Sequence, residues 1–254
     1  MPTVREIFDT IESWAPLSLQ MSFDNAGFLL GHGDRQVTRC LLALDVTVPV
    51  IEEAAAWGAE LIVAHHPLIF DPLRSLTDEG DGRKALMLAE RGVAVICMHT
   101  NLDIASGGVN DVLIRLLGAE PEETLDADGC GRVGTLPAPL PMEEFLARCK
   151  TRLQCAGLRY HDAGRPVRRL AVMGGAGGSA LRSALEKDCD TYVTADVKYH
   201  VFLDAAEQGI NLIDADHFCT ENPVIPELAR RLREVYPQVV FAVSRVHGQT
   251  ARFF

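Results

Sequence analysis

Two adjacent histidines stand where a buried strand is expected to end. The sequence reads "AELIVAHHPLIF" over residues 59–70, so an apolar run is followed at once by His65, His66 and Pro67. Side chains alternate faces along a regular strand, so both imidazoles can approach one pocket only beyond the strand's end. Proline fixes the exit of the chain and favours an extended conformation at His66. The pair indicates a metal site; the alternative is two partly exposed histidines in a turn.

The next expected strand is followed by residues of the same kinds. "VAVICM" (93–98) leads into "HTNLDIASGGVND", which places His99 and Asp103 just after the strand. Ligand sites gather at the carboxyl ends of parallel strands, and nitrogen with carboxylate ligands suits a divalent cation. Asp103 would otherwise cap the following helix, but Asn110 and Asp111 suit that role better. His99 is also a candidate catalytic proton carrier, because imidazole titrates near neutral pH.

A third strand end adds another pair. "INLIDA" (210–215) precedes "DHFCTENPVIPEL", in which His217 and Glu221 are one helical turn apart and can converge. The simpler interpretations are a solvated His217 and a Glu221 that complements the helix N-terminus. Cys219 between them is either a soft ligand or points away. Together the three strand ends offer more ligands than one four-coordinate ion with an open position uses, which favours two ions. The candidate ligands are His65, His66, Asp103, His217 and Glu221.

A glycine-rich loop carries a competing signal. In "VMGGAGGSALRSAL", Gly175, Gly177 and Ala180 satisfy a relaxed dinucleotide-binding pattern, with Asp196 about 20 residues further on. So short a pattern often matches by chance, and a tight strand-to-helix turn is the alternative. Beyond it, "TADVKYH" collects Asp196, Lys198 and His200. These are either substrate contacts, with His200 as a second candidate catalytic residue, or a salt-bridged helix start.

Helix and strand signals alternate along the whole chain, which indicates crossover units. We expect an α/β protein of two interlinked lobes with largely parallel sheets. The first, metal-binding lobe is predicted over 1–125 plus 215–254 and the second over 126–214. The acidic, glycine-containing stretch 119–136 is predicted as a passage between them.

Composition restricts the class of protein. The net charge of −11 argues against a nucleic-acid partner, which requires a concentrated positive surface. No apolar run reaches the roughly 20 residues of a membrane span, and the N-terminus lacks the layout of a signal peptide. The seven cysteines form no CxxC pair, so neither a disulfide framework nor a thiolate zinc knuckle is indicated. We therefore expect a cytoplasmic protein.

Five segments together resemble one known family. "SFDNAGFLLG", "AHHPLIF", "HTNLDIASGGVND", "TADVKYH" and "DADHFCTEN" are similar to motifs of the Nif-three-like dinuclear metal proteins, named GTP cyclohydrolase 1 type 2 homologs. The resemblance covers essentially the whole chain. The order and spacing of the motifs agree with the compact form of the family. It implies a Nif-three-like fold and a ring-shaped homohexamer. It also implies His66 and Asp103 on one ion, His65 and His217 on the other, and Glu221 between them.

The chain departs from the family pattern at two positions. Asp216 stands where the family usually has glycine before the histidine, and Ala195 replaces another usual glycine. The first change adds a negative charge beside the expected site.

The resemblance and the ligand types together lead to a functional hypothesis. We expect a metal-dependent hydrolase in which two divalent ions generate hydroxide for attack on a nucleotide or related heterocycle, with C8 of a purine as the implied target. The ligands accept zinc, iron, manganese, nickel or cobalt. The alternatives are a non-catalytic metal-handling or protein-interaction assembly, and a dinucleotide-dependent oxidoreductase built on the glycine loop.

Overall fold

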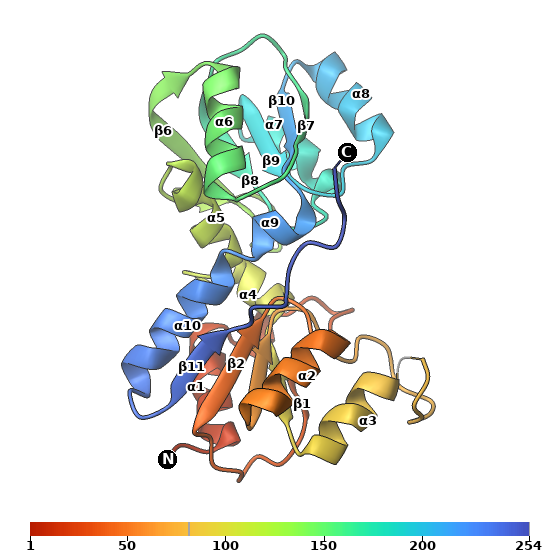
Figure 1. Cartoon of the computed structure of the whole chain (residues 1–254). Helices are drawn as coiled ribbons and strands as arrows, with labels where there is room; N and C mark the ends of the chain where they lie inside the picture. Colours follow the sequence, from red (N-terminus) through yellow and green to blue (C-terminus); the bar gives the residue numbers. More distant parts are fainter. Residues whose placement is uncertain (81, 254) are drawn as a thin grey trace. The chain divides into compact units, whose positions relative to one another are not determined.

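The computed structural model describes residues 1–80 and 82–253 and divides into two compact units (Figure 1). Unit 1 comprises Met1–Ala105 and Ile225–Gly248. Unit 2 comprises Ser106–Val224 and the C-terminal segment from Gln249. The chain thus leaves unit 1, forms most of unit 2 and returns, which confirms the predicted interlinked α/β architecture.

Unit 1 contains a largely parallel sheet with the strand order β1-β4-β3-β2-β11. Strands β11, β2, β3 and β4 run parallel, and β1 pairs antiparallel with β4. The strands are β1 (Gly27–Leu30), β2 (Arg39–Ala43), β3 (Leu61–Ala64), β4 (Ala94–Cys97) and β11 (Val240–Val243). All residues of β3 and β4 are buried, as expected for parallel strands covered on both faces. The carboxyl ends of β2, β3 and β4 therefore share one edge of the sheet.

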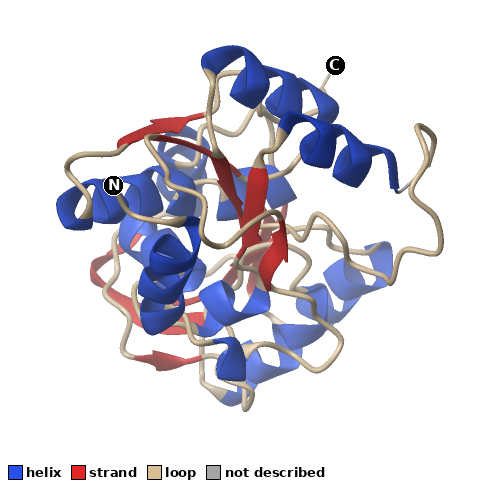
Figure 2. Cartoon of the chain, turned by 90° about the horizontal axis from the view of Figure 1, so that it is seen from below, coloured by secondary structure: helices blue, strands red, loops and turns tan. Residues whose placement is uncertain are grey.

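Helices alternate with these strands along the chain; Figure 2 draws the helices of the whole chain in blue and its strands in red. The helices next to these strands in sequence are α1 (Val4–Trp14), α2 (Val48–Trp57), α3 (Gly82–Arg91), α4 (Thr100–Ile104) and α10 (Val224–Val235), with a short 3-10 turn at Leu17–Leu19. A capping box begins α1, because the side chains of Thr3 and Glu6 each accept from the other residue's backbone N–H. Helix α2 ends at Gly58, whose φ of +73° is left-handed.

Unit 2 contains a mixed sheet with the order β5-β6-β8-β9-β10-β7. Its centre, β8-β9-β10, is parallel as predicted, whereas β5, β6 and β7 pair antiparallel at the two sides. The strands are β5 (Glu123–Thr124), β6 (Arg132–Leu140), β7 (Arg159–His161), β8 (Val167–Val172), β9 (Thr191–Thr194) and β10 (Asn211–Asp214). The helices are α5 (Val109–Leu117), α6 (Met142–Arg152), α7 (Leu181–Glu186), α8 (Tyr199–Gln208) and α9 (His217–Glu221), with a 3-10 turn at Gly178–Ala180.

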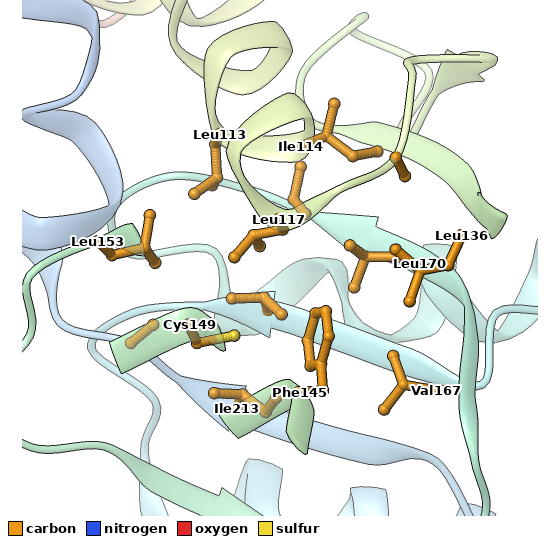
Figure 3. Close-up of a cluster of buried hydrophobic side chains, with 14 of the residues drawn as sticks. Leu113, Ile114, Leu117, Leu136, Phe145, Cys149, Leu153, Val167, Leu170 and Ile213 are labelled. Atoms are coloured by element: carbon orange, nitrogen blue, oxygen red, sulfur yellow. The ribbon is translucent and has the colours of Figure 1, made fainter. Parts of the chain in front are cut away.

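The core of unit 2 explains where the chain divides. Leu113 and Leu117 of α5 pack in one buried cluster with Phe145 of α6 and Leu170 of β8 (Figure 3). Cys219 of α9 belongs to the same cluster. Because α5 and α9 bury apolar side chains in this core, both helices belong to unit 2.

The unit boundaries consequently differ from the predicted ones of 1–125 plus 215–254 and 126–214. Residues 106–125 and 215–224 lie in unit 2. The stretch 119–136, predicted as a passage between lobes, contains β5 and the first part of β6, which pair as a hairpin inside unit 2. No helix among the described residues is long and apolar enough to cross a bilayer.

Candidate metal centre

His65 and His66 follow β3 directly and turn toward opposite neighbours of that strand. The backbone N–H groups of both residues donate to the carbonyl oxygen of Leu44, at 3.2 and 3.0 Å, so the regular alternation has ended here. His65 Nδ1 lies 2.7 Å from the carbonyl oxygen of Met98, which follows β4. His66 Nδ1 lies 2.7 Å from Asp45 Oδ1, which follows β2. The two rings remain close, with centroids 5.0 Å apart. Adjacent imidazoles thus serve one site because each is held by a different flanking strand.

His99 and Asp103 join this pair from the end of β4. The His99 ring lies 5.2 Å from the His65 ring and 5.6 Å from the His66 ring, measured between centroids. Asp103 lies one helical turn further on in α4 and is buried, with Oδ1 3.6 Å from His65 Nε2. One nitrogen from each of the three histidines lies within 4.8 Å of the others, close enough to share a cation.

Asp24, in the loop before β1, fixes the orientation of His99. Its buried carboxylate accepts from His99 Nδ1 at 2.8 Å and from the backbone N–H of Thr100 at 3.0 Å, and the Thr100 hydroxyl also donates to it. Burial alone would raise the pKa of Asp24, but the hydrogen bonds from His99 and Thr100 outweigh it and hold that pKa well below its usual value. Asp24 is therefore a permanent anion behind His99.

In unit 2, His217 and Glu221 form a second ligand pair on α9. His217 Nε2 lies 3.1 Å from Glu221 Oε2, and His217 Nδ1 lies 2.7 Å from Asp196 Oδ2. The hydrogen bond to Glu221, followed by its charge and by Asp196, outweighs burial and raises the pKa of His217 to about 9. The pair is thus a protonated imidazole and a buried carboxylate, and a cation must displace that proton.

The backbone conformation at Asp216 is one that glycine adopts most readily. Its φ of +69° lies in the left-handed region, which side chains other than glycine rarely adopt. Its carboxylate caps α9 by accepting from the backbone N–H of Cys219 at 3.1 Å, and it also accepts from the Gln249 amide. The additional charge at this position therefore stabilises the start of the ligand helix.

The glycine loop after β8 makes room for the ligand pair. A Cβ at Gly175 would lie 2.2 Å from Glu221 Oε1 and 3.2 Å from His217 Nε2, and the φ of Gly175 is +66°. The loop's N–H groups are engaged internally: Gly174 donates to Asn110 Oδ1, Gly175 to Thr220 Oγ1 and Gly177 to Thr194 Oγ1. These bonds argue against the dinucleotide hypothesis, because a phosphate cradle needs its N–H groups directed at the ligand. The loop is a packing element against α9.

The donor set fits divalent cations. The candidate ligands His65, His66 and His217 each have an acceptor on Nδ1, which orients the ring and leaves Nε2 as the ligand nitrogen. The candidate proton carrier His99 is held in the same way. Buried carboxylates accompany them in both units, namely Asp103 and Glu221. Nitrogen and carboxylate donors of this kind suit first-row transition metals.

Comparison with known proteins identifies the family. The model of the family Duf34/NIF3 (NGG1p interacting factor 3) matches residues 2–250. The chain belongs to the Duf34/NIF3 family. It is 35% identical to a Clostridium perfringens protein named GTP cyclohydrolase 1 type 2 homolog, over 95% of this chain and 96% of that relative. A Lactococcus lactis protein of the same name is 36% identical over 87% of this chain and 88% of its own length. Among solved structures, a Bacillus cereus protein related to NIF3 aligns with a TM-score of 0.93 and 25% identity, covering 100% of this chain and 99% of that one. The expected Nif-three-like fold is confirmed.

Within this Duf34/NIF3 chain, the predicted residues separate by unit. Unit 1 brings His65, His66 and Asp103 together with the candidate His99, and unit 2 joins His217 to Glu221. His200 instead lines a groove between α7 and α8. Cys219 is buried in the apolar core of unit 2, where the neighbouring Cys155 thiol and burial raise its pKa.

The sequence did not indicate the carboxylates that orient three of the imidazoles. Asp45 and Asp24 received no role, and Asp196 was predicted either to contact substrate or to lie in a salt-bridged helix start, not to hold His217. Asp45 follows a strand just as the histidines do, so the same signal could have identified it. Asp24 contacts His99 across 75 residues of sequence, and no local pattern indicates that contact.

Proposed function

We propose that the protein is a metal-dependent hydrolase acting on a nucleotide or a related heterocycle. Two divalent ions would be held by His65, His66, Asp103, His217 and Glu221. The observation that carries this proposal is the acceptor on Nδ1 of each ligand imidazole, since such an acceptor is typical of metal-binding histidines. The name of the relatives, GTP cyclohydrolase 1 type 2 homolog, supports the reaction class.

The chemistry divides between the ions and the chain. When bound, two divalent ions supply Lewis acidity and lower the pKa of water, so that hydroxide forms near neutral pH. The chain keeps Asp103 and Glu221 buried and orients each ligand imidazole through its Nδ1. His99, whose Nδ1 is fixed by Asp24, accepts and returns a proton at Nε2. In the reaction, water adds to an electron-poor ring carbon, C8 in the case of a purine. The adjacent ring C–N bond then breaks and its nitrogen takes up a proton, which opens the ring.

Elemental analysis of protein purified without added metal tests the ligand set. We expect about two ions per chain, as a dinuclear site requires. His65→Ala and Glu221→Ala should each lower that content while the far-ultraviolet circular dichroism stays unchanged. His200→Ala is the matched control, because this exposed histidine lies in the α7–α8 groove. Metal content unchanged by both ligand substitutions would contradict the site.

Turnover separates the hydrolase from a non-catalytic metal-handling assembly. Fully loaded protein is offered GTP and a panel of nucleotides, and products are followed by chromatography. We expect ring opening of a purine substrate that is lost in His99→Ala with metal content retained. No turnover by fully loaded protein, combined with rapid exchange of its metal, would support the non-catalytic alternative.

A ring-shaped homohexamer is part of the same proposal. Its support is the resemblance to the Nif-three-like family. Sedimentation equilibrium of the metal-loaded protein measures the mass of the assembly directly. A mass of one or two chains at micromolar concentration would contradict the hexamer.

A further inference from the structure

Two exposed phenylalanines lie beside the imidazole cluster of unit 1. The side chain of Phe23, in the loop before β1, is 66% exposed, and that of Phe70, after β3, is 47% exposed. Their ring centroids are 6.5 Å apart. The Phe70 ring stands edge-on to His99, with centroids 6.3 Å apart and planes at 81°. An aromatic pair on two different loops thus adjoins the candidate metal ligands.

Both loops are held firmly by polar contacts around the two rings. The backbone N–H of Met21 donates to Thr100 Oγ1 at 3.0 Å, and the Asn25 side chain donates to the carbonyl oxygen of Ile69 at 2.6 Å. Asp24, which follows Phe23, is fixed by His99 and Thr100. The hydrogen bonds on each side of Phe23, and the one to the residue before Phe70, fix the backbone from which both exposed rings project.

Leaving two neighbouring phenyl rings in solvent is unfavourable for the isolated fold. Burying a phenyl side chain stabilises a fold, and this fold forgoes much of that stabilisation at two neighbouring positions. Single exposed apolar residues are ordinary, whereas adjoining ones beside a chemical site mark a binding surface. Planar bases stack on aromatic side chains whatever their hydrogen-bonding pattern.

We propose that Phe23 and Phe70 form a stacking wall that binds the planar ring of the substrate, a purine base, next to His99. The inference rests on the proposed function, because it names the part of the substrate that this surface recognises. The wall selects heteroaromatic compounds over ring-free ones, and the imidazole cluster then acts on the stacked ring.

Purine binding by the full-length, metal-loaded protein tests the wall without any turnover. Phe23→Trp keeps a stacking surface and reports on it by fluorescence; wild-type protein, with Trp14 and Trp57, gives the background signal. Phe23→Ala and Phe70→Ala remove one ring each. Leu203→Ala is the matched control, because this α8 side chain is also 47% exposed. The probes are guanosine, which carries a base and no phosphate, and ribose 5-phosphate, which carries a phosphate and no base.

We expect guanosine to quench the new tryptophan and ribose 5-phosphate to leave it unchanged. Isothermal titration should show about a tenfold loss of guanosine affinity in each alanine variant and none in Leu203→Ala. Equal guanosine affinity in wild-type and both alanine variants would overturn the inference. So would a lower assembly mass in Phe23→Ala with guanosine binding unchanged, since the pair would then be a contact between copies of this chain.

Measurement of GTP turnover keeps the two proposals distinct. Ring-dependent guanosine binding without any turnover would refute the hydrolase and support the wall. Turnover with the same KM in wild-type and both alanine variants would support the hydrolase and refute the wall.

Discussion

Gly175→Ala should damage the candidate metal centre without touching a ligand residue. A Cβ at this position would lie 2.2 Å from Glu221 Oε1 and 3.2 Å from His217 Nε2. The backbone of Gly175 has little freedom to withdraw. Its N–H donates to Thr220 Oγ1 at 3.0 Å, and its carbonyl oxygen accepts from the N–H of Ala195 at 2.9 Å. The Glu221 carboxylate must therefore move instead.

The substitution should lower both the folding stability and the metal affinity of the protein. The left-handed φ of +66° costs an alanine about 1–2 kcal/mol of stability. Displacing Glu221 disturbs a ligand directly, and disturbing the support of a metal ligand typically lowers metal affinity about 10–100-fold. Gly209→Ala isolates the first effect, because Gly209 also lies in unit 2, has a φ of +68° and has nothing within 4 Å of the added Cβ.

Urea denaturation of the metal-free variants measures the strain, and competition with a chelator measures metal affinity. Gly209→Ala should lose about 1–2 kcal/mol of folding stability, as expected for one strained residue, and should keep wild-type metal affinity. Gly175→Ala should lose at least as much stability and about 10–100-fold in affinity. If the two variants bind metal equally well, Glu221 is no ligand and the interpretation of this loop is refuted.

Five further expectations concern protons, metal and the core. Asp45→Asn should lower metal affinity about 10–100-fold in the chelator assay with the fold retained, because it weakens the anchor of His66. Metal affinity should rise about tenfold per pH unit between about 6.5 and 9 and level off above, since the cation displaces the proton that Glu221 keeps on His217. In metal-free protein the same raised pKa contributes stability that is fully present below about 6.5 and is lost as pH rises through 9, as urea midpoints across pH will show. Phe145→Ala empties a fully buried position of unit 2 and should cost about 3–5 kcal/mol in urea denaturation. Chelation of metal held at 100 times its Kd should remove about 2.7 kcal/mol of stability for each ion bound, measured as a lower Tm.

The sequence predicts the elements that are themselves apolar and periodic. In α1, β3 and β4 the apolar residues of the sequence are the buried ones, so the pattern of apolar residues locates these elements along the chain. Strands β5 and β7 escape prediction because their side chains, such as those of Glu123 and Tyr160, are mostly exposed. Pairing with β6 and β10, rather than a core-facing pattern, makes them strands.

The same distinction applies to the site. His65, His66, His99 and Asp103 were predictable because strand ends concentrate ligands, and unit 1 brings them together. The role of Asp24 was not, because it arises from a tertiary contact between a loop and the distant His99. Strand periodicity locates donors, whereas the acceptors that orient them depend on which loops the fold places nearby.

Orientation of the imidazoles also links metal affinity to acidity. His65 is held by a backbone carbonyl, which no substitution removes and which carries no net charge. His66, His99 and His217 are held by carboxylates, which orient the rings. At His217 the carboxylates of Glu221 and Asp196 both face the ring and raise its pKa to about 9. The carboxylates that prepare this ring for metal therefore also make the proton its strongest competitor, and the cation must be bound tightly enough to displace it at neutral pH.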